Sequence, residues 1–140
     1  MSRNNARIAL YTHIQNNFSS AEVCFSGDDQ RAEALENGTD PWIYIYIAWG
    51  GEVQKSTGSP YVRFVQIGTL AAKLYVRKED GEGVLDTITD AYSAITRCKQ
   101  IGNITIDPMK AGPTRPNDKW QVRDLYSPFS VSNHFSILST

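Results

Sequence analysis

The clearest pattern in the chain is a strand-like alternation between Trp42 and Trp49. Its side chains form an aliphatic set and an aromatic set: Ile43, Ile45 and Ile47 against Trp42, Tyr44 and Tyr46. Successive side chains of a strand point to opposite faces, so the two sets lie on opposite faces. Neither face suits bulk water. The pattern therefore predicts a central strand with a helix on one face and an amphipathic cover on the other.

A second extended segment runs from Tyr61 to Arg77, and its alternation continues across Gly68. This pattern predicts either two strands or one long bent strand. At about 3.3 Å per residue it would reach roughly 50 Å, more than most globular domains need. Gly50-Gly51 is expected to break or bend the preceding strand, and residues 52–57 to continue as an edge strand or hairpin arm. Such an arm often serves in assembly.

Two amphipathic stretches predict the main helices, residues 5–17 and 84–99. Their apolar stripes are Ala6, Leu10, Ile14 and Phe18 in the first, and Leu85, Ile88, Tyr92 and Ile95 in the second. Ile8 falls on the polar side of the first helix, where an apolar residue indicates a contact with a partner chain. A short strand at 22–25 and a short helix at 30–36 are also predicted.

The C-terminal third predicts a strand at Ile104–Ile106, a long Pro- and Gly-rich loop over residues 107–119, and a last strand over 120–131. The apolar positions change parity along that last strand, so a bulge is expected near Asp124. Pro128 predicts an edge position or a chain exit. Together the elements predict one α+β domain over residues 1–140. Its mixed or antiparallel sheet carries two main helices on one face, a long β-arm or hairpin, and long loops.

Composition narrows the functional classes. The chain has 140 residues, a formal net charge of −1 and two cysteines outside any CxxC pair. A general polyanion binder usually has a basic excess, which is missing here. The cysteines are expected to be reduced and packed as small hydrophobes. The longest strongly apolar run is too short for a bilayer, and no apolar run follows the N-terminus, so we expect no membrane partner and a cytoplasmic or assembly location.

No catalytic pattern emerges from the sequence. His13 and His134 have no Asp, Glu or Cys at metal-ligand spacing, and nucleophile-elbow, P-loop and dinucleotide fingerprints do not occur. We therefore predict a protein that is not an enzyme, without catalytic residues, cofactor or metal. The aromatic face of Trp42, Tyr44 and Tyr46 resembles a base-stacking platform, but no basic residue shares that strand. Core or subunit packing is the favoured reading.

The order and spacing of these elements resemble the small tail-terminator (tail-completion) proteins of long-tailed bacteriophages, the lambda-type family. The resemblance covers nearly the whole chain. It rests on Ser-Arg-Asn before the first helix, on Pro41-Trp42-Ile43-Tyr44-Ile45 leading through Gly50-Gly51-Glu52 to Ala72-Lys73-Leu74-Tyr75-Val76 and the helix from Leu85 to Arg97, and on Trp120-Gln121-Val122 closing in Ser127-Pro128-Phe129.

The resemblance implies a structural virion protein, a homohexameric ring assembled in the host cytoplasm and located at the head–tail junction. The ring would cap the tail tube, end its growth and join the head-side connector, while genomic DNA passes through without sequence-specific binding. We expect Trp49, Glu52, Lys55 and Arg63 at contacts between neighbours, and Arg115 and Lys119 at a contact with another ring, the tube or DNA. The alternatives are another connector ring (head-closure or neck), a nucleic-acid-binding α+β module, or a small enzyme without a recognisable motif.

Overall fold

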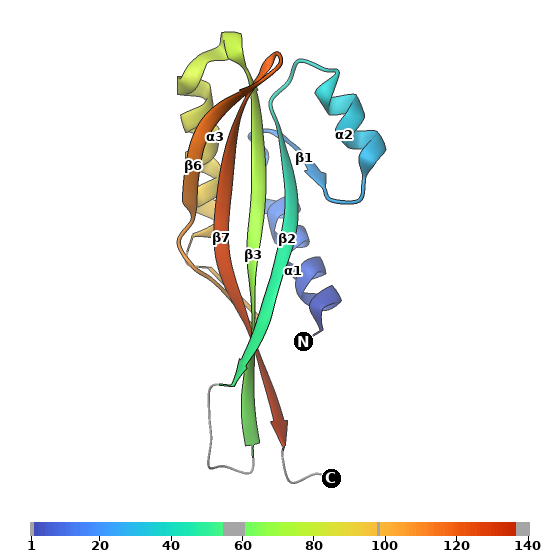
Figure 1. The fold of residues 1–140 in the computed structure, drawn as a ribbon, viewed down its shortest axis with the longest axis vertical. Coiled ribbons are helices and arrows are strands. Elements are labelled where there is room, and N and C mark those ends of the chain that lie inside the picture. Colours follow the sequence, from blue (N-terminus) through green and yellow to red (C-terminus); the bar gives the residue numbers. More distant parts are fainter. Residues whose placement is uncertain (1, 55–60, 98, 137–140) are drawn as a thin grey trace.

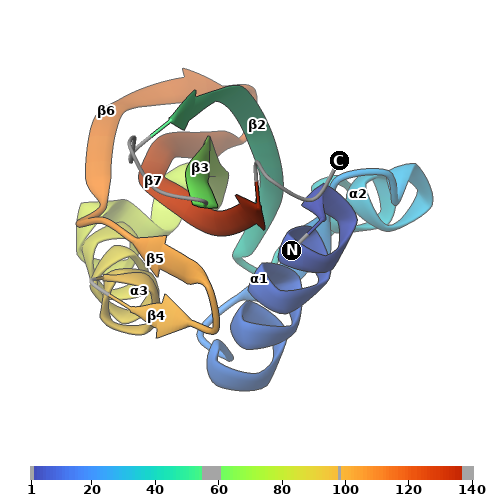
Figure 2. The same cartoon turned by 90° about the horizontal axis from the view of Figure 1, so that it is seen from below.

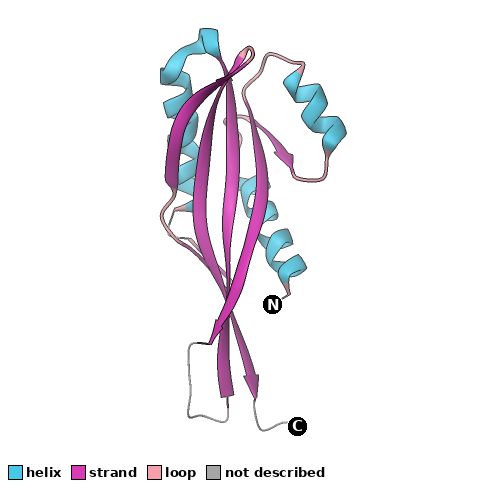
Figure 3. Cartoon of the chain, viewed as in Figure 1, coloured by secondary structure: helices cyan, strands magenta, loops and turns pink. Residues whose placement is uncertain are grey.

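The computed structural model describes residues 2–54, 61–97 and 99–136, and it has an α+β fold (Figures 1 and 3). The described helices are α1 (Arg3–Asn17), α2 (Asp29–Glu36) and α3 (Gly81–Thr96), with a 3-10 turn, η1 (Lys78–Asp80), before α3. The described strands are β1 (Glu22–Phe25), β2 (Trp42–Gln54), β3 (Tyr61–Arg77), β4 (Gln100–Ile101), β5 (Ile104–Ile106), β6 (Lys110–Asn117) and β7 (Trp120–Ser136). They form one mixed sheet in the order β1-β2-β3-β7-β5-β4, with β6 also paired to β7.

Two long strands form the spine of the sheet. β3 pairs antiparallel with β7 without a break, from Tyr61 opposite Ser136 to Arg77 opposite Trp120. Of the two alternatives predicted, one long strand across Gly68 is therefore confirmed. β2 lies antiparallel on the other side of β3, and β1 pairs parallel with the first residues of β2. The predicted strands at 22–25 and 104–106 are also confirmed.

The face of the sheet that packs against α1 and α3 is called the inner face here. Ala6, Leu10 and Ile14 of α1 are buried against it. From α3, Leu85 and Tyr92 join the same core. This arrangement confirms two main helices on one face. α3 begins and ends three residues earlier than predicted, and η1 directly precedes it.

The opposite, outer face carries a second and smaller core, in which α2 covers one end of the sheet. Ala32 and Leu35 of α2 pack against Cys24, Trp42, Trp120 and Val122. This core explains the parity change in β7. Trp120 and Val122 point outward beneath α2, whereas Leu125 and Phe129 point into the inner core. The bulge predicted in this strand near Asp124 is absent, since β7 keeps its register with β3 and buries different faces at its two ends. The register shift opposite Asp124 lies in the neighbouring strand β6, between Ala111 and Thr114.

The loop predicted over residues 107–119 is also wrong, because most of it is the strand β6. β6 pairs antiparallel with β7, with a register shift between Ala111 and Thr114. Within the described sheet β6 pairs with no strand other than β7, so Pro113 and Pro116 lie on an edge strand, where a missing backbone donor is tolerated. The prolines of this segment are therefore features of an edge strand and not of the predicted loop.

Pro128 lies inside the sheet, contrary to the predicted edge or exit. It pairs with Thr69 of β3, and its carbonyl accepts from the amide of Asp107 at 2.8 Å. The nitrogen and carbonyl of one strand residue face the same side, so the nitrogen of Pro128 faces the connection between β5 and β6. No ladder hydrogen bond to β3 is lost.

Gly50 and Gly51 form the bulge that the sequence indicated, between Trp49 and Glu52 of β2. Beyond the bulge, residues 50–54, 61–67 and 130–136 of β2, β3 and β7 form an extension, called the arm, whose base also pairs with β5 at Ser130 and Val131. Figure 1 shows it projecting past both inner-face helices, and Figure 2 looks along it. The predicted arm is confirmed over residues 52–54, and residues 55–57 lie outside the described residues.

Candidate assembly surfaces

The outer face beyond α2 carries a surface that α2 does not cover. It consists of Tyr46 and Ala48 of β2, Ile67 and Thr69 of β3, and Tyr126 of β7, and it is called the outer patch. Ile67 and Tyr126 are each 40% exposed. The register places Tyr46, Ala71 and Tyr126 in one row across the three strands. Large apolar side chains at this exposure are unusual in a group, so the patch is a candidate contact surface.

The β2 bulge explains the exposure of Ile67. The β2 residue next to Ile67 is Gly50, which has no side chain to cover it. The ideal Cβ position of Gly50 lies 3.2 Å from the Ile67 carbonyl. On β7 the partner of Ile67 is the small Ser130. Val53, which is also exposed, continues the apolar surface into the arm opposite Val65. Two glycines therefore bend the arm and uncover an isoleucine.

Arg115, predicted to contact a ring, tube or DNA, lies beside the tyrosines of the outer face. Its guanidinium donates to both carboxylate oxygens of Asp124, at 3.0 and 3.4 Å. Burial raises the pKa of Tyr46 and of Tyr75, and the positive charge of Arg115 partly opposes both shifts. Arg115 is therefore held by the body of the protein, and its charge is largely matched.

Trp49 and Glu52, predicted at neighbour contacts, lie on either side of the β2 bulge. Trp49 packs edge-on against Phe129, with ring centroids 5.3 Å apart, and the Arg3 guanidinium lies 5.7 Å from its ring centre. Much of the Trp49 side chain therefore contacts residues of its own chain. Glu52 is exposed on the arm and accepts one hydrogen bond from Gln66 at 3.2 Å.

The remaining predicted contacts are separate from these. Lys119 lies at the turn between β6 and β7, with its ammonium 5.7 Å from the Trp120 ring centre. Arg63 is paired with His134 in the arm, and only its backbone is described. Lys55 lies outside the described residues.

The solvent-facing side of α1 is a second candidate surface. Its exposed residues include Asn4, Ile8, Thr12, Gln15 and Asn16, and Ile8 is 55% exposed. The helix contains Arg3 and Arg7 near its start and no Asp, Glu or Lys. A helix face this poor in charge is typical of a contact surface. The sequence signalled it only through Ile8.

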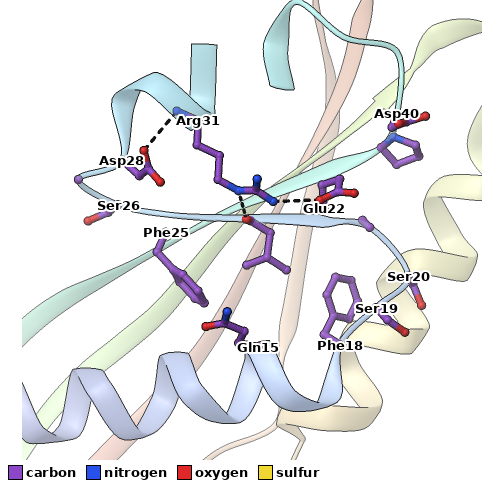
Figure 4. Close-up of a pocket in the computed structure, with 14 residues that line it drawn as sticks. Gln15, Phe18, Ser19, Ser20, Glu22, Phe25, Ser26, Asp28, Arg31 and Asp40 are labelled. Carbon is purple, nitrogen blue, oxygen red and sulfur yellow. Dashed lines mark hydrogen bonds and ion pairs between the residues drawn. The ribbon is translucent and has the colours of Figure 1, made fainter. Parts of the chain in front are cut away.

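A hollow of 1030 Å³ lies between the end of α1, β1 and the start of α2 (Figure 4). Arg31 crosses it and donates to the Val23 carbonyl at 2.7 Å and to Glu22 at 2.9 Å. Asp28 caps α2 by accepting from the Arg31 amide at 3.2 Å. Arg31 and Glu22 thus form an ion pair, Asp28 is engaged as a helix cap, and the hollow is open to solvent.

The described residues contain no group of three or more His, Cys, Asp or Glu side chains placed to hold a metal ion. Cys24 is a buried free thiol, as predicted, and burial raises its pKa; Cys98 lies outside the described residues. Within the described part of the chain, every helix is too short or too polar to cross a membrane.

No protein-family model and no curated protein matches the chain. Twelve chains of solved structures match its fold. One of them, known by an identifier that states no function, is 10% identical and has a TM-score of 0.62. The match covers 94% of this chain and 96% of that chain, so the two share the fold over nearly their whole lengths.

Proposed function

We propose that this protein is a ring-forming structural subunit that caps a bacteriophage tail tube and joins it to the head-side connector. The observation that carries the proposal is the arm, which leaves the body at the β2 bulge and extends past the helices. A lone domain gains little from three strands that extend beyond its helices. A subunit of an assembly uses such strands to contact neighbours or the tube.

The position of the exposed apolar groups supports the same proposal. Four of the five large hydrophobic side chains that are exposed in the described residues lie on the outer face or on α1: Val53, Ile67, Tyr126 and Ile8. Assembly by such surfaces depends on a few buried anchors and not on single surface ion pairs. The sequence order that resembles tail terminators gives the assembly its proposed identity and its virion location.

A length assay on growing tail tubes tests this function. Purified protein is added to tube subunits during polymerisation, and tube lengths and end caps are measured by electron microscopy. A terminator gives shorter tubes with a ring on one end, and native mass measurement gives a closed oligomer. A protein that stays monomeric at every concentration and never binds tubes contradicts the proposal. Binding to a purified connector ring and not to tubes favours the alternative connector-ring function.

One observation favours a second candidate function, a nucleic-acid-binding surface. Arg115 and Lys73 lie on the outer face with Tyr44, Tyr46 and Tyr126, and bases stack on such aromatic groups. The Arg115–Asp124 ion pair weakens this candidate, because it neutralises one of the cations beside the tyrosines. Oligonucleotide affinity that falls steeply with salt, and that is lost in Tyr126→Ala, would favour it.

A further inference from the structure

α1 and the outer patch lie on opposite sides of one subunit, and each has an exposed apolar side chain among polar ones. Ala6, Leu10 and Ile14 face the inner core, and Ile8 lies about 200° around the helix from Ala6. Ile8 therefore points away from the sheet on the helix side, while Ile67 and Tyr126 point away on the other side. The two surfaces cannot meet within one chain.

Their chemistry is complementary. The α1 surface presents Asn4 and Thr12 one turn to either side of Ile8, and the outer patch presents the phenols of Tyr46 and Tyr126 near Ile67. Amides and hydroxyls both donate and accept hydrogen bonds. Beside the patch, Arg115 is paired with Asp124, and the register places the exposed Lys110 opposite Tyr126. Apolar anchors with a polar rim are typical of protein–protein contacts.

The two surfaces also lie at the same level along the molecule. Arg3, at the start of α1, lies over Trp49, and Tyr11 stacks on Phe25 with ring centroids 4.3 Å apart. Phe25 pairs with Ile45, so α1 spans the levels of β2 from Trp49 to Ile45. Tyr46 and Ala48 of the outer patch lie between those levels. Two copies can therefore bring α1 of one against the outer patch of the other with little displacement along their long axes.

We propose that the solvent face of α1 in one copy packs on the outer patch of the next copy. The proposal deepens the ring function above and rests on it. Because one surface meets a different one, the contact is head-to-tail, and repetition gives a closed ring or an open filament. The shared level of the two surfaces favours closure. Each copy uses both surfaces once, and the arm remains outside the contact at its far end.

Thiol cross-linking in the full chain tests the contact. Ile8→Cys and Ile67→Cys are made separately and together, in a Cys98→Ser background, and treated with a short bismaleimide. A mixture of the two single variants should give a cross-linked dimer that neither gives alone. The double variant should give a ladder that stops at the ring size. Val84→Cys, at 38% exposure on α3, is the matched control and should not cross-link with either variant.

The outcomes separate the contact from the function. A closed ring by native mass without the Ile8–Ile67 product overturns this contact and leaves the ring function standing. An Ile8–Ile8 product that dominates the double variant also overturns it, because it indicates a two-fold contact. A filament ladder without tube capping supports the contact and contradicts the terminator function. Monomers without any product, with and without tail tubes, overturn both.

Discussion

The ring of Phe129 occupies the space that a side chain on Gly68 would need. The ideal Cβ position of Gly68 lies 2.5 Å from Cζ and 2.8 Å from Cε1 of Phe129. The two residues face each other across β3 and β7, and Trp49 completes the row on β2. This row lies at the base of the arm, directly before the β2 bulge. Close packing of a ring over glycine therefore fixes the point from which the arm projects.

Gly68→Ala should destabilise the protein by about 1–3 kcal/mol, because a buried ring cannot move aside without strain in the core. Gly51→Ala is the control, since a Cβ there meets no atom within 4 Å. That control should change the free energy of unfolding by less than about 1 kcal/mol. Urea denaturation followed by circular dichroism measures both. Equal effects at the two glycines would contradict the close packing.

Arg123 should matter more to stability than the carboxylate it pairs with. It donates to Asp86 at 2.7 Å, to Thr89 at 3.2 Å and to Thr114 at 3.3 Å, and so links α3 and β6 to β7. Arg123→Met should cost about 2–3 kcal/mol. Asp86 is 62% exposed, so Asp86→Asn should cost less than about 1 kcal/mol, and that cost should fall with added salt. Chemical denaturation at low and high salt measures the difference, and a larger loss for Asp86→Asn would refute this ranking.

The strands β2 and β3 and the inner-face helices could be predicted because each carries one period of apolar residues over many positions. The alternation from Trp42 to Trp49 and the four-residue steps of α1 needed no tertiary information. The glycine pair at 50–51 likewise indicated a bend from local chemistry alone. These features are determined by residues that are close together in the sequence, so the sequence alone is enough to predict them.

The rest depends on partners that are distant in sequence. Residues 110–117 form a strand only because β7 supplies their hydrogen bonds, and their prolines hide that tendency. Trp120 and Leu125 have opposite parity because different cores cover the two faces of β7, and the short, polar α2 gave little sign of covering either. The candidate surfaces were harder still. Trp49 and Arg115 were chosen for chemical type, and the structure engages both within the chain.

Trp120 should control the stability of α2. None of the residues of α2 is fully buried, and the Trp120 indole donates to the Glu36 carbonyl at its end, at 3.3 Å. Trp120→Phe keeps most of the ring packing and removes that donor, at a cost of about 1 kcal/mol. Hydrogen exchange should become faster in α2 and stay unchanged in α3, since local opening follows local contacts. Exchange that quickens equally in both helices would indicate global destabilisation instead.

Tyr92 should make the protein sensitive to alkali. Its ring is fully buried against Phe18, and no described group makes a hydrogen bond with its hydroxyl. Burial raises the pKa of this phenol far above its ordinary value. An unfolded tyrosine titrates near pH 10, so the folded chain holds a proton that the unfolded chain loses. The contribution of Tyr92 to stability is complete below about pH 10 and is lost as pH rises above it, by at most about 1.4 kcal/mol per pH unit.

Tyr92→Phe should therefore act in two ways. At neutral pH it removes a buried hydroxyl without a partner, which should raise the free energy of unfolding by about 1 kcal/mol. Above pH 10 it should make the loss of stability shallower, although Tyr11, Tyr46 and Tyr75, whose pKa values burial also raises, keep part of the slope. Tyr126→Phe, on the exposed outer patch, is the control and should follow the wild type. Urea denaturation from pH 7 to 11 measures both effects. An unchanged alkaline slope in Tyr92→Phe would mean that the phenol reaches water in the folded protein, because only a buried phenol loses its proton more easily on unfolding.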